Sequence, residues 1–195
     1  MRVVSSRLTP ERTDELYAAV LRLLTEVGYD RLTMDRVAEE SRSSKATLYR
    51  QWGGKESLVV AAFDAHAPEL HPVADTGSLR GDFLELYRTF EEEVDPDIAL
   101  AGAVIHACKT HPSLAESLHE RVVVARVAVL DEVLERAVAR GEIDADAPAI
   151  PFLVPALVGP AMIRELIERK PADMAYLTAF LDAVILPALG ITTPA

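Results

Sequence analysis

The chain has 195 residues, half of them hydrophobic, and carries a formal net charge of −11. Its single cysteine, Cys108, excludes an internal disulfide and suits a reducing compartment. The charged N-terminal stretch lacks the apolar run of a secretion signal. Charge or proline also interrupts every apolar window long enough to span a membrane, segment 147–163 included. We therefore expect a cytoplasmic protein without a membrane partner.

The charge is spread unevenly along the chain. Residues 1–56 hold ten Lys and Arg against nine Asp and Glu, whereas residues 57–195 hold ten against twenty-two. The stretch 41–55, SRSSKATLYRQWGGK, carries four basic residues and no acidic one. An acidic protein generally repels phosphates. Because the N-terminal part is not acidic overall, binding to nucleic acid remains possible there.

Apolar residues recur at spacings of three and four along the whole chain, which predicts an all-α fold of about nine helices. The first helix is expected to begin after Thr9 as N-cap and to end at Gly28. Two short helices at 33–40 and 44–52 follow, and then a fourth at 55–66.

The stretch 67–77 contains two prolines and a glycine and is the best candidate for a domain boundary. We place one domain at 8–68 and a second at 69–195. Within the second, a proline precedes a long helix predicted from about 112 to 140, which ends at Gly141. Two apolar helical segments, near 147–169 and 172–189, complete the chain.

Only residues 41–43 separate helices 33–40 and 44–52, a length that matches a helix-turn-helix, whose second helix enters the major groove of DNA. Leu48 and Trp52 lie four apart and are expected to face the core. The remaining polar and basic side chains suit phosphates and base edges. The candidate DNA contacts are Thr33, Arg42, Ser43, Ser44, Lys45, Thr47, Tyr49, Arg50, Gln51 and Lys55. By spacing and charge alone, a solvated helix pair is an equal alternative.

The run from Thr33 to Leu58, TMDRVAEESRSSKATLYRQWGGKESL, resembles the DNA-binding domain of TetR-type transcriptional regulators. The resemblance covers about 50 residues. The shared landmarks are Gly28, Thr33, Val37-Ala38, Lys45, Thr47-Leu48-Tyr49, Trp52, Lys55-Glu56 and Leu58.

This resemblance implies a cytoplasmic homodimer, usually a repressor, in which two recognition helices read a palindromic operator. The implied architecture is an N-terminal three-helix helix-turn-helix domain followed by a C-terminal helical bundle for ligand binding and dimerisation. The family positions that touch DNA correspond here to Ser44, Lys45, Thr47, Tyr49 and Lys55, with Tyr49 and Lys55 mainly on phosphate.

The resemblance also implies roles for the C-terminal part. The helices near 147–169 and 172–189 are expected to form the dimer interface, because they are rich in apolar residues. A small-molecule effector would release the protein from DNA. The candidate pocket residues are Phe83, Tyr87, Phe90, His106 and Met162, although each of them is more commonly a core residue. Their mixed polarity suits an apolar or aromatic effector with one or two polar groups.

The turn at 41–43 departs from the family pattern of a small residue, a glycine and a buried apolar residue. If the middle position keeps a left-handed backbone, Arg42 costs about 1 kcal/mol relative to glycine. Ser43 is expected to bury a hydroxyl where a methyl group normally packs. In return, Arg42 adds a positive charge close to the DNA backbone.

Other classes of function remain as alternatives. The chain contains no GxSxG, HExxH or GxGxxG motif, so we expect no catalytic residue and no cofactor. The pairs His66/His71 and His106/His111 are five apart, about 140° round a helix, which disfavours a shared metal ion. A metal or thiol site at Cys108 near His106 is a minor alternative. A module whose DNA-binding surface has decayed is another, and absence of sequence-selective DNA binding would distinguish it.

Overall fold

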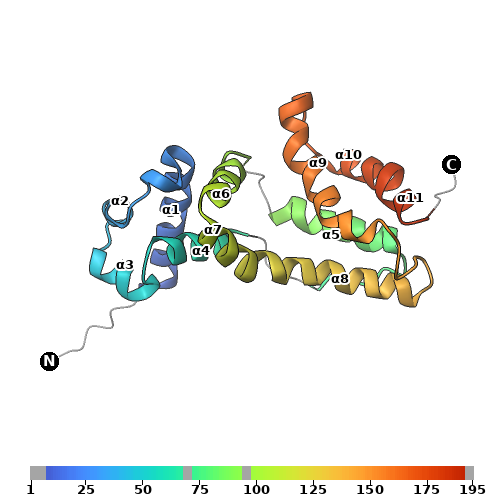
Figure 1. The fold of residues 1–195 in the computed structure, drawn as a ribbon, viewed down its shortest axis with the longest axis horizontal. Helices are drawn as coiled ribbons and strands as arrows, with labels where there is room; N and C mark the ends of the chain where they lie inside the picture. The colour runs from blue at the N-terminus through green and yellow to red at the C-terminus, as the bar shows by residue number, and fades with distance from the viewer. Residues whose placement is uncertain (1–7, 68–71, 94–97, 192–195) are drawn as a thin grey trace. The chain divides into compact units, whose positions relative to one another are not determined.

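The computed structural model describes residues 8–67, 72–93 and 98–191, and every regular element in these ranges is helical (Figure 1). The all-α prediction is therefore confirmed. Contacts divide the chain into two compact units. The N-terminal unit draws on Met1–Ala67 and Asp97–Val124, and the C-terminal unit on Pro68–Pro96 and Ala125–Ala195.

The first helices of the N-terminal unit begin and end close to where the sequence predicts. They are α1 (Pro10–Arg31), α2 (Met34–Glu40), α3 (Lys45–Trp52) and α4 (Lys55–His66). The hydroxyls of Thr9, Thr33 and Ser44 cap α1, α2 and α3, each accepting a hydrogen bond from a backbone N–H of the first turn. These caps satisfy amides that have no partner within the helix, so they fix where each helix starts.

Helix α1 continues past Gly28, where the sequence analysis expected it to end. Gly28 itself leaves the helical conformation, with φ of 76°, and one further turn follows as far as Arg31. The N–H of Leu32 then bonds to the carbonyls of Gly28 and Tyr29 and ends the helix. The break was predicted correctly, but the extra turn was not, because it depends on these later hydrogen bonds.

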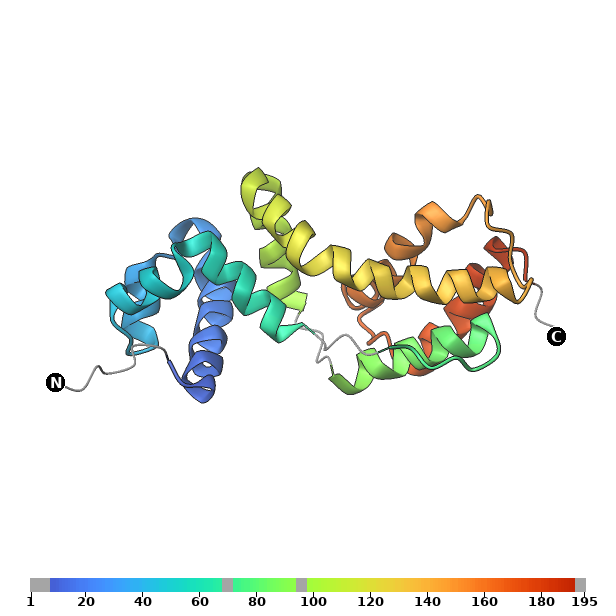
Figure 2. The same cartoon turned by 90° about the horizontal axis from the view of Figure 1, so that it is seen from below.

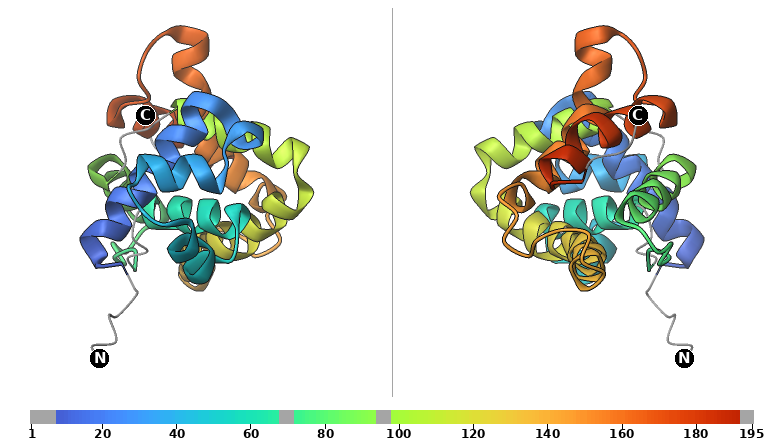
Figure 3. Two further views of the ribbon diagram at one scale, coloured as in Figure 1. Left: turned by 90° about the vertical axis from the view of Figure 1, so that its left-hand side faces the viewer. Right: turned by 90° about the vertical axis from the view of Figure 1, so that its right-hand side faces the viewer.

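The N-terminal unit also contains segments that follow the predicted boundary. These are α6 (Ile98–Thr110), α7 (Pro112–Leu118) and the π-helical turn η1 (His119–Val123). Helix α6 packs on α1, and α7 packs on α4. The N-terminal helices, drawn from their side of the molecule in the left panel of Figure 3, share one core, whose fully buried members include Leu16, Leu24, Val37, Leu48 and Leu58. The division of functions at residue 68 stays a prediction.

The C-terminal unit is built from helices of mixed length (Figure 2). They are α5 (Leu79–Glu93), α8 (Val124–Ala139), the 3-10 turn η2 (Ile150–Phe152), α9 (Leu153–Glu168), α10 (Met174–Phe180), the π-helical turn η3 (Leu181–Ile185) and α11 (Leu186–Ala188). Residues 112–139 are helical throughout, as predicted, although apolar spacing gave no sign of the π-helical turn. The core of this unit is centred on Phe83, Leu134, Leu153, Leu181 and Ile185.

A buried carboxylate joins the start of α5 to the end of α8. Asp82 is fully buried and accepts hydrogen bonds from the amide and hydroxyl of Thr76, at 2.8 and 2.7 Å, and from Arg140 at 3.0 Å. Burial raises the pKa of the Asp82 carboxyl, but these hydrogen bonds and the Arg140 charge outweigh burial and hold it below its ordinary value. The buried charge is therefore compensated, as burial requires.

Among the described residues, no single helix combines the length and the apolar composition that a membrane crossing requires. Two segments, Ile150–Pro160 and Met162–Glu168, reach that length and composition only when counted together across a bend of 50°. Core helices of proteins outside membranes can meet the same criteria.

Candidate nucleic-acid interface

The turn between α2 and α3 is a left-handed helix C-cap. Arg42 has φ of 50°, so the middle position does keep the left-handed backbone that glycine normally supplies. The N–H of Ser43 bonds to the carbonyl of Ala38 at 2.9 Å, and the N–H of Arg42 bonds to that of Glu39 at 3.2 Å. These two bonds are the pair that defines a Schellman motif. The turn thus has the usual geometry despite lacking glycine.

The serines of this turn are satisfied by hydrogen bonds. Ser41 is the buried one, and its hydroxyl donates to the carbonyl of Val37 at 2.7 Å. Ser43, which the sequence analysis expected to bury its hydroxyl, is half-buried and donates to the carbonyl of Ser41 at 3.4 Å. Arg12 of α1 donates to that same carbonyl at 2.7 Å. Helix α1 therefore holds the turn in place through a contact that local spacing does not reveal.

Helix α3 has a buried side and an exposed polar side. Leu48 is fully buried, and Trp52 is half-buried with its indole N–H donating to the hydroxyl of Tyr17 at 3.2 Å. Both inward positions were predicted. On the outer side, Tyr49 is 51% exposed, and Arg50 and Gln51 are exposed as well. The core contacts of α3 thus fix which side chains face solvent.

The start of α3 is ordered by its own hydroxyl groups. The Ser44 hydroxyl accepts from the Thr47 N–H at 3.1 Å and lies 2.9 Å from the Thr47 hydroxyl. Lys45 is exposed, and its ammonium lies 2.5 Å from a carboxylate oxygen of Asp35 on α2. Thr33 caps α2 and is exposed. In helix-turn-helix proteins the start of the second helix contacts DNA, so the role of these residues as DNA contacts stays a prediction.

Lys55 is held at the start of α4 by Tyr29. Its ammonium donates to the Tyr29 carbonyl at 2.9 Å and lies 3.9 Å from the centre of the Tyr29 ring. The next residue, Glu56, accepts hydrogen bonds from the hydroxyls of Ser117 and Ser113 on α7, each at 2.7 Å. These two bonds lower the pKa of the Glu56 carboxyl. The first turn of α4 is thus tied to both α1 and α7, and none of these partners was predicted.

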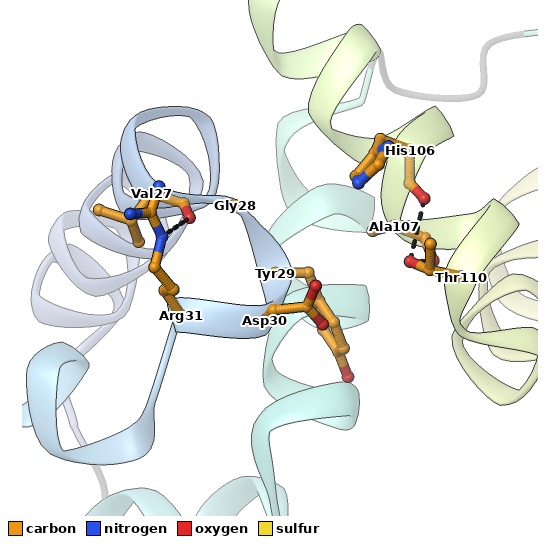
Figure 4. A pocket seen from close by; sticks show the side chains of 8 residues that line it. All are labelled: Val27, Gly28, Tyr29, Asp30, Arg31, His106, Ala107 and Thr110. Carbon is orange, nitrogen blue, oxygen red and sulfur yellow. Dashed lines mark hydrogen bonds between the residues drawn. The ribbon is translucent and has the colours of Figure 1, made fainter.

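A pocket of about 380 Å³ lies within the N-terminal unit, between the last turn of α1 and α6. Figure 4 shows His106 reaching from α6 toward this turn of α1, and Tyr29, Asp30 and Arg31 line the opposite wall. Asp30 also binds His111, with 2.6 Å between carboxylate oxygen and ring nitrogen. The structure therefore brings His106 together with α1.

The other predicted effector residues belong to the C-terminal unit. Phe83 and Tyr87 lie in its core, and Met162 is half-buried on α9. Burial raises the pKa of the Tyr87 phenol to about 12, and its hydroxyl has no hydrogen-bond partner among the described residues. The Phe90 side chain lies outside the described residues. His106 belongs to the N-terminal unit, whereas Phe83, Tyr87 and Met162 belong to the C-terminal unit. The role of the five residues stays a prediction.

The last helices divide their apolar residues between the core and solvent. The core takes Leu153, Leu157, Leu177, Leu181 and Ile185, which the sequence alone could not separate from surface positions. The large apolar side chains left exposed in this region are Phe152, Val158, Ile163, Leu166, Ile167 and Val184.

The described residues hold no group of three or more His, Cys, Asp or Glu that could bind a metal ion. Cys108 is half-buried, and burial raises the pKa of its thiol, which disfavours the reactive thiolate.

Comparison with known proteins agrees with this arrangement. Residues 16–62 match the family described as bacterial regulatory proteins of the tetR family, and residues 73–184 match the tetracyclin repressor-like C-terminal domain. The HTH-type transcriptional regulator Rv1556 of Mycobacterium tuberculosis, named as uncharacterized, is 39% identical over 93% of this chain and 90% of its own. The DNA-binding transcriptional repressor TetR of Mycobacteroides abscessus is 32% identical over 90% of this chain and 92% of its own.

Solved structures show the same fold. The TetR family transcription regulator SCO0332 superposes with a TM-score of 0.64 at 31% identity, covering 94% of this chain and all of the other. The flavonoid-responsive regulator FrrA superposes with a TM-score of 0.70 at 21% identity, covering 93% and 97%. The family consists of DNA-binding regulators that are generally not enzymes and that act as dimers. This chain belongs to the TetR family of helix-turn-helix transcriptional regulators.

Proposed function

We propose that this regulator is a cytoplasmic repressor that binds a palindromic operator as a homodimer and leaves it when a small molecule binds. Repression is typical of the family, and one relative 32% identical to the chain carries the name of a repressor. The observation that carries the proposal is the exposed polar side of α3. The buried Leu48 and the left-handed turn at Arg42 fix the orientation of this helix.

In this proposal the exposed side of α3 contacts DNA in the major groove. Thr47 and Gln51 would read base edges, because hydroxyl and amide groups can both donate and accept hydrogen bonds there. Arg42, Lys45, Tyr49 and the other members of the predicted contact set would bind phosphates. The remaining members are Thr33, Ser43, Ser44, Arg50 and Lys55.

A second copy of the chain would cover the exposed apolar side chains of α9 and its neighbours. Leu166 and Ile167 are 78% and 72% exposed, and Ile163 lies one turn before them. An apolar patch of this kind is unusual for a monomer surface and suits a dimer interface. Dimerisation would place two copies of α3 on the two half-sites of a palindrome.

The effector would bind within the C-terminal unit, near Phe83, Tyr87 and Met162. The unpartnered hydroxyl of Tyr87 supports this location, because a buried polar group without a partner is rare and is relieved by a ligand that bonds to it. An apolar molecule with a single hydrogen-bonding group fits these residues. Phe90, whose side chain lies outside the described residues, and His106, which belongs to the N-terminal unit, stay predictions from the sequence.

The test is to incubate the purified protein with sheared DNA from its own source and to sequence the bound fragments. Enrichment of a few fragments that share a palindrome is expected, and transcription from the adjacent promoter should fall when the protein is added in vitro. Uniform recovery of fragments by folded, dimeric protein would contradict the proposal and favour a decayed DNA-binding module.

A further inference from the structure

Lys45, at the start of the recognition helix, is paired within the protein before it meets any DNA. Its ammonium lies 2.5 Å from a carboxylate oxygen of Asp35, in the first turn of α2. The side chains are 56% and 62% exposed, so the pair faces solvent. An exposed pair of this kind contributes only about 0–1 kcal/mol, and a phosphate can therefore displace the carboxylate.

We propose that the Asp35 carboxylate competes with DNA phosphate for the Lys45 ammonium. This competition lowers the affinity of the protein for DNA of any sequence. The inference rests on Lys45 meeting phosphate as proposed above. In free protein the Asp35 carboxylate neutralises the Lys45 ammonium. On binding, the ammonium moves from carboxylate to phosphate, and the carboxylate is left beside the DNA backbone.

Two electrostatic effects then oppose binding. The pair with Asp35 must be broken, and the uncovered carboxylate repels the nearby phosphates. Both effects concern contacts with the phosphate backbone, which is the same in every sequence. They therefore lower the affinity for operator and non-operator DNA by a similar factor. The stretch 41–55 has no acidic residue of its own. The negative charge that opposes phosphate binding by α3 therefore comes from Asp35 on the neighbouring helix.

Asp35 also changes the dependence on salt. A phosphate contact by a free lysine releases about 0.9 counterion from B-DNA. When Lys45 leaves Asp35, however, the carboxylate attracts a cation from solution, which cancels part of this release. Removing the carboxylate should therefore steepen the decrease of affinity with salt by up to about 0.9 in the log–log slope.

The test compares Asp35→Asn with wild-type protein on a 30-base-pair duplex of scrambled sequence and on a palindromic duplex recovered from the source DNA. Asp35→Asn should bind both duplexes about 3- to 10-fold more tightly, with a steeper salt slope. In a Lys45→Gln background the same substitution should have a smaller effect, because there is no pair to break and only the repulsion between the carboxylate and phosphate remains. Asp35→Ser serves as a second variant if the first does not fold.

Asp14→Asn is the matched control, because Asp14 is an exposed carboxylate on α1 and its loss changes the net charge equally. If Asp14→Asn raises affinity as much as Asp35→Asn does, net charge is responsible and the proposal is wrong. It is also wrong if the effect of Asp35→Asn persists undiminished without Lys45. If no palindrome is recovered but the predicted effect is seen on the scrambled duplex, operator reading fails while the competition stands.

Discussion

Arg42 takes a backbone conformation that glycine adopts with less strain. With φ of 50°, it occupies the left-handed position of the turn between α2 and α3. This conformation costs a residue with a Cβ atom about 1 kcal/mol. The exposed guanidinium is also a proposed phosphate contact, so stability and DNA binding place opposite demands on this residue.

Replacing Arg42 separates these two demands. Arg42→Gly should raise the free energy of unfolding by up to about 1 kcal/mol, because the strain is removed. It should also weaken DNA binding several-fold, because a cation near phosphate is lost. Arg42→Ala is the control, since it removes the charge but keeps the strain. If urea unfolding gave the same stability for both variants, the turn would not be strained.

Single positions were predictable where one helix decides them. Leu48 and Trp52 were assigned inward from their spacing. A left-handed backbone at Arg42 was considered only as a condition, from the family pattern of the turn. The partners of Lys45 and Lys55, Asp35 and Tyr29, were not predicted, because they lie on other helices. Spacing along one helix carries no information about which side chain of another helix it meets.

At the scale of elements, Asp82 links the segment before α5 to the end of α8 through its hydrogen bonds to Thr76 and Arg140. Asp82→Asn keeps the shape of the side chain but removes a buried charge that faces Arg140 and Arg136. The free energy of unfolding should fall by up to about 3 kcal/mol at neutral pH, because Arg136 and Arg140 lose a buried carboxylate, although Arg140 keeps Glu142 and Asp75 as partners.

The depressed pKa of Asp82 also makes this stabilisation depend on pH. Its carboxyl is ionised more readily in the folded than in the unfolded chain, so the stabilisation is complete above about pH 4, the ordinary range for Asp. It is lost as the pH falls through the lower folded value. Urea unfolding from pH 7 downward should therefore show a steeper loss of stability below about pH 4 in wild type than in Asp82→Asn. Equal pH profiles would contradict the assignment.

The order of helices was largely predictable, but their grouping was not. Caps and prolines mark the starts of α1, α2, α3 and α7, and glycine or proline marks several ends. The prolines and glycine at 67–77 suggested a boundary, yet α6 and α7 pack with α1 and α4. Such packing joins segments that are distant along the chain, and local composition does not record it.

At the scale of the whole molecule, dimerisation is expected to depend on the exposed apolar side chains of α9. Leu166→Glu places a charge where a second copy should pack, and it should leave a folded monomer because Leu166 is 78% exposed. Operator affinity should fall at least about 10-fold, because the two half-sites are no longer bound together.

Ile105→Glu is the matched control, since Ile105 is an exposed apolar residue on α6. It should remain dimeric in analytical ultracentrifugation, whereas Leu166→Glu should sediment as a monomer. A Leu166→Glu protein that stays dimeric would exclude this part of α9 from the interface.

Sequence reading by α3 is tested most directly by selection from a library of random duplexes, with wild-type protein and with Gln51→Ala side by side. Wild type should select a palindrome. Gln51→Ala should select the same half-site spacing but lose the base preference at one symmetric pair of positions, because an amide that reads a base edge is gone. An unchanged motif for Gln51→Ala, or no motif for wild-type protein, would contradict the assignment of α3 as the recognition helix.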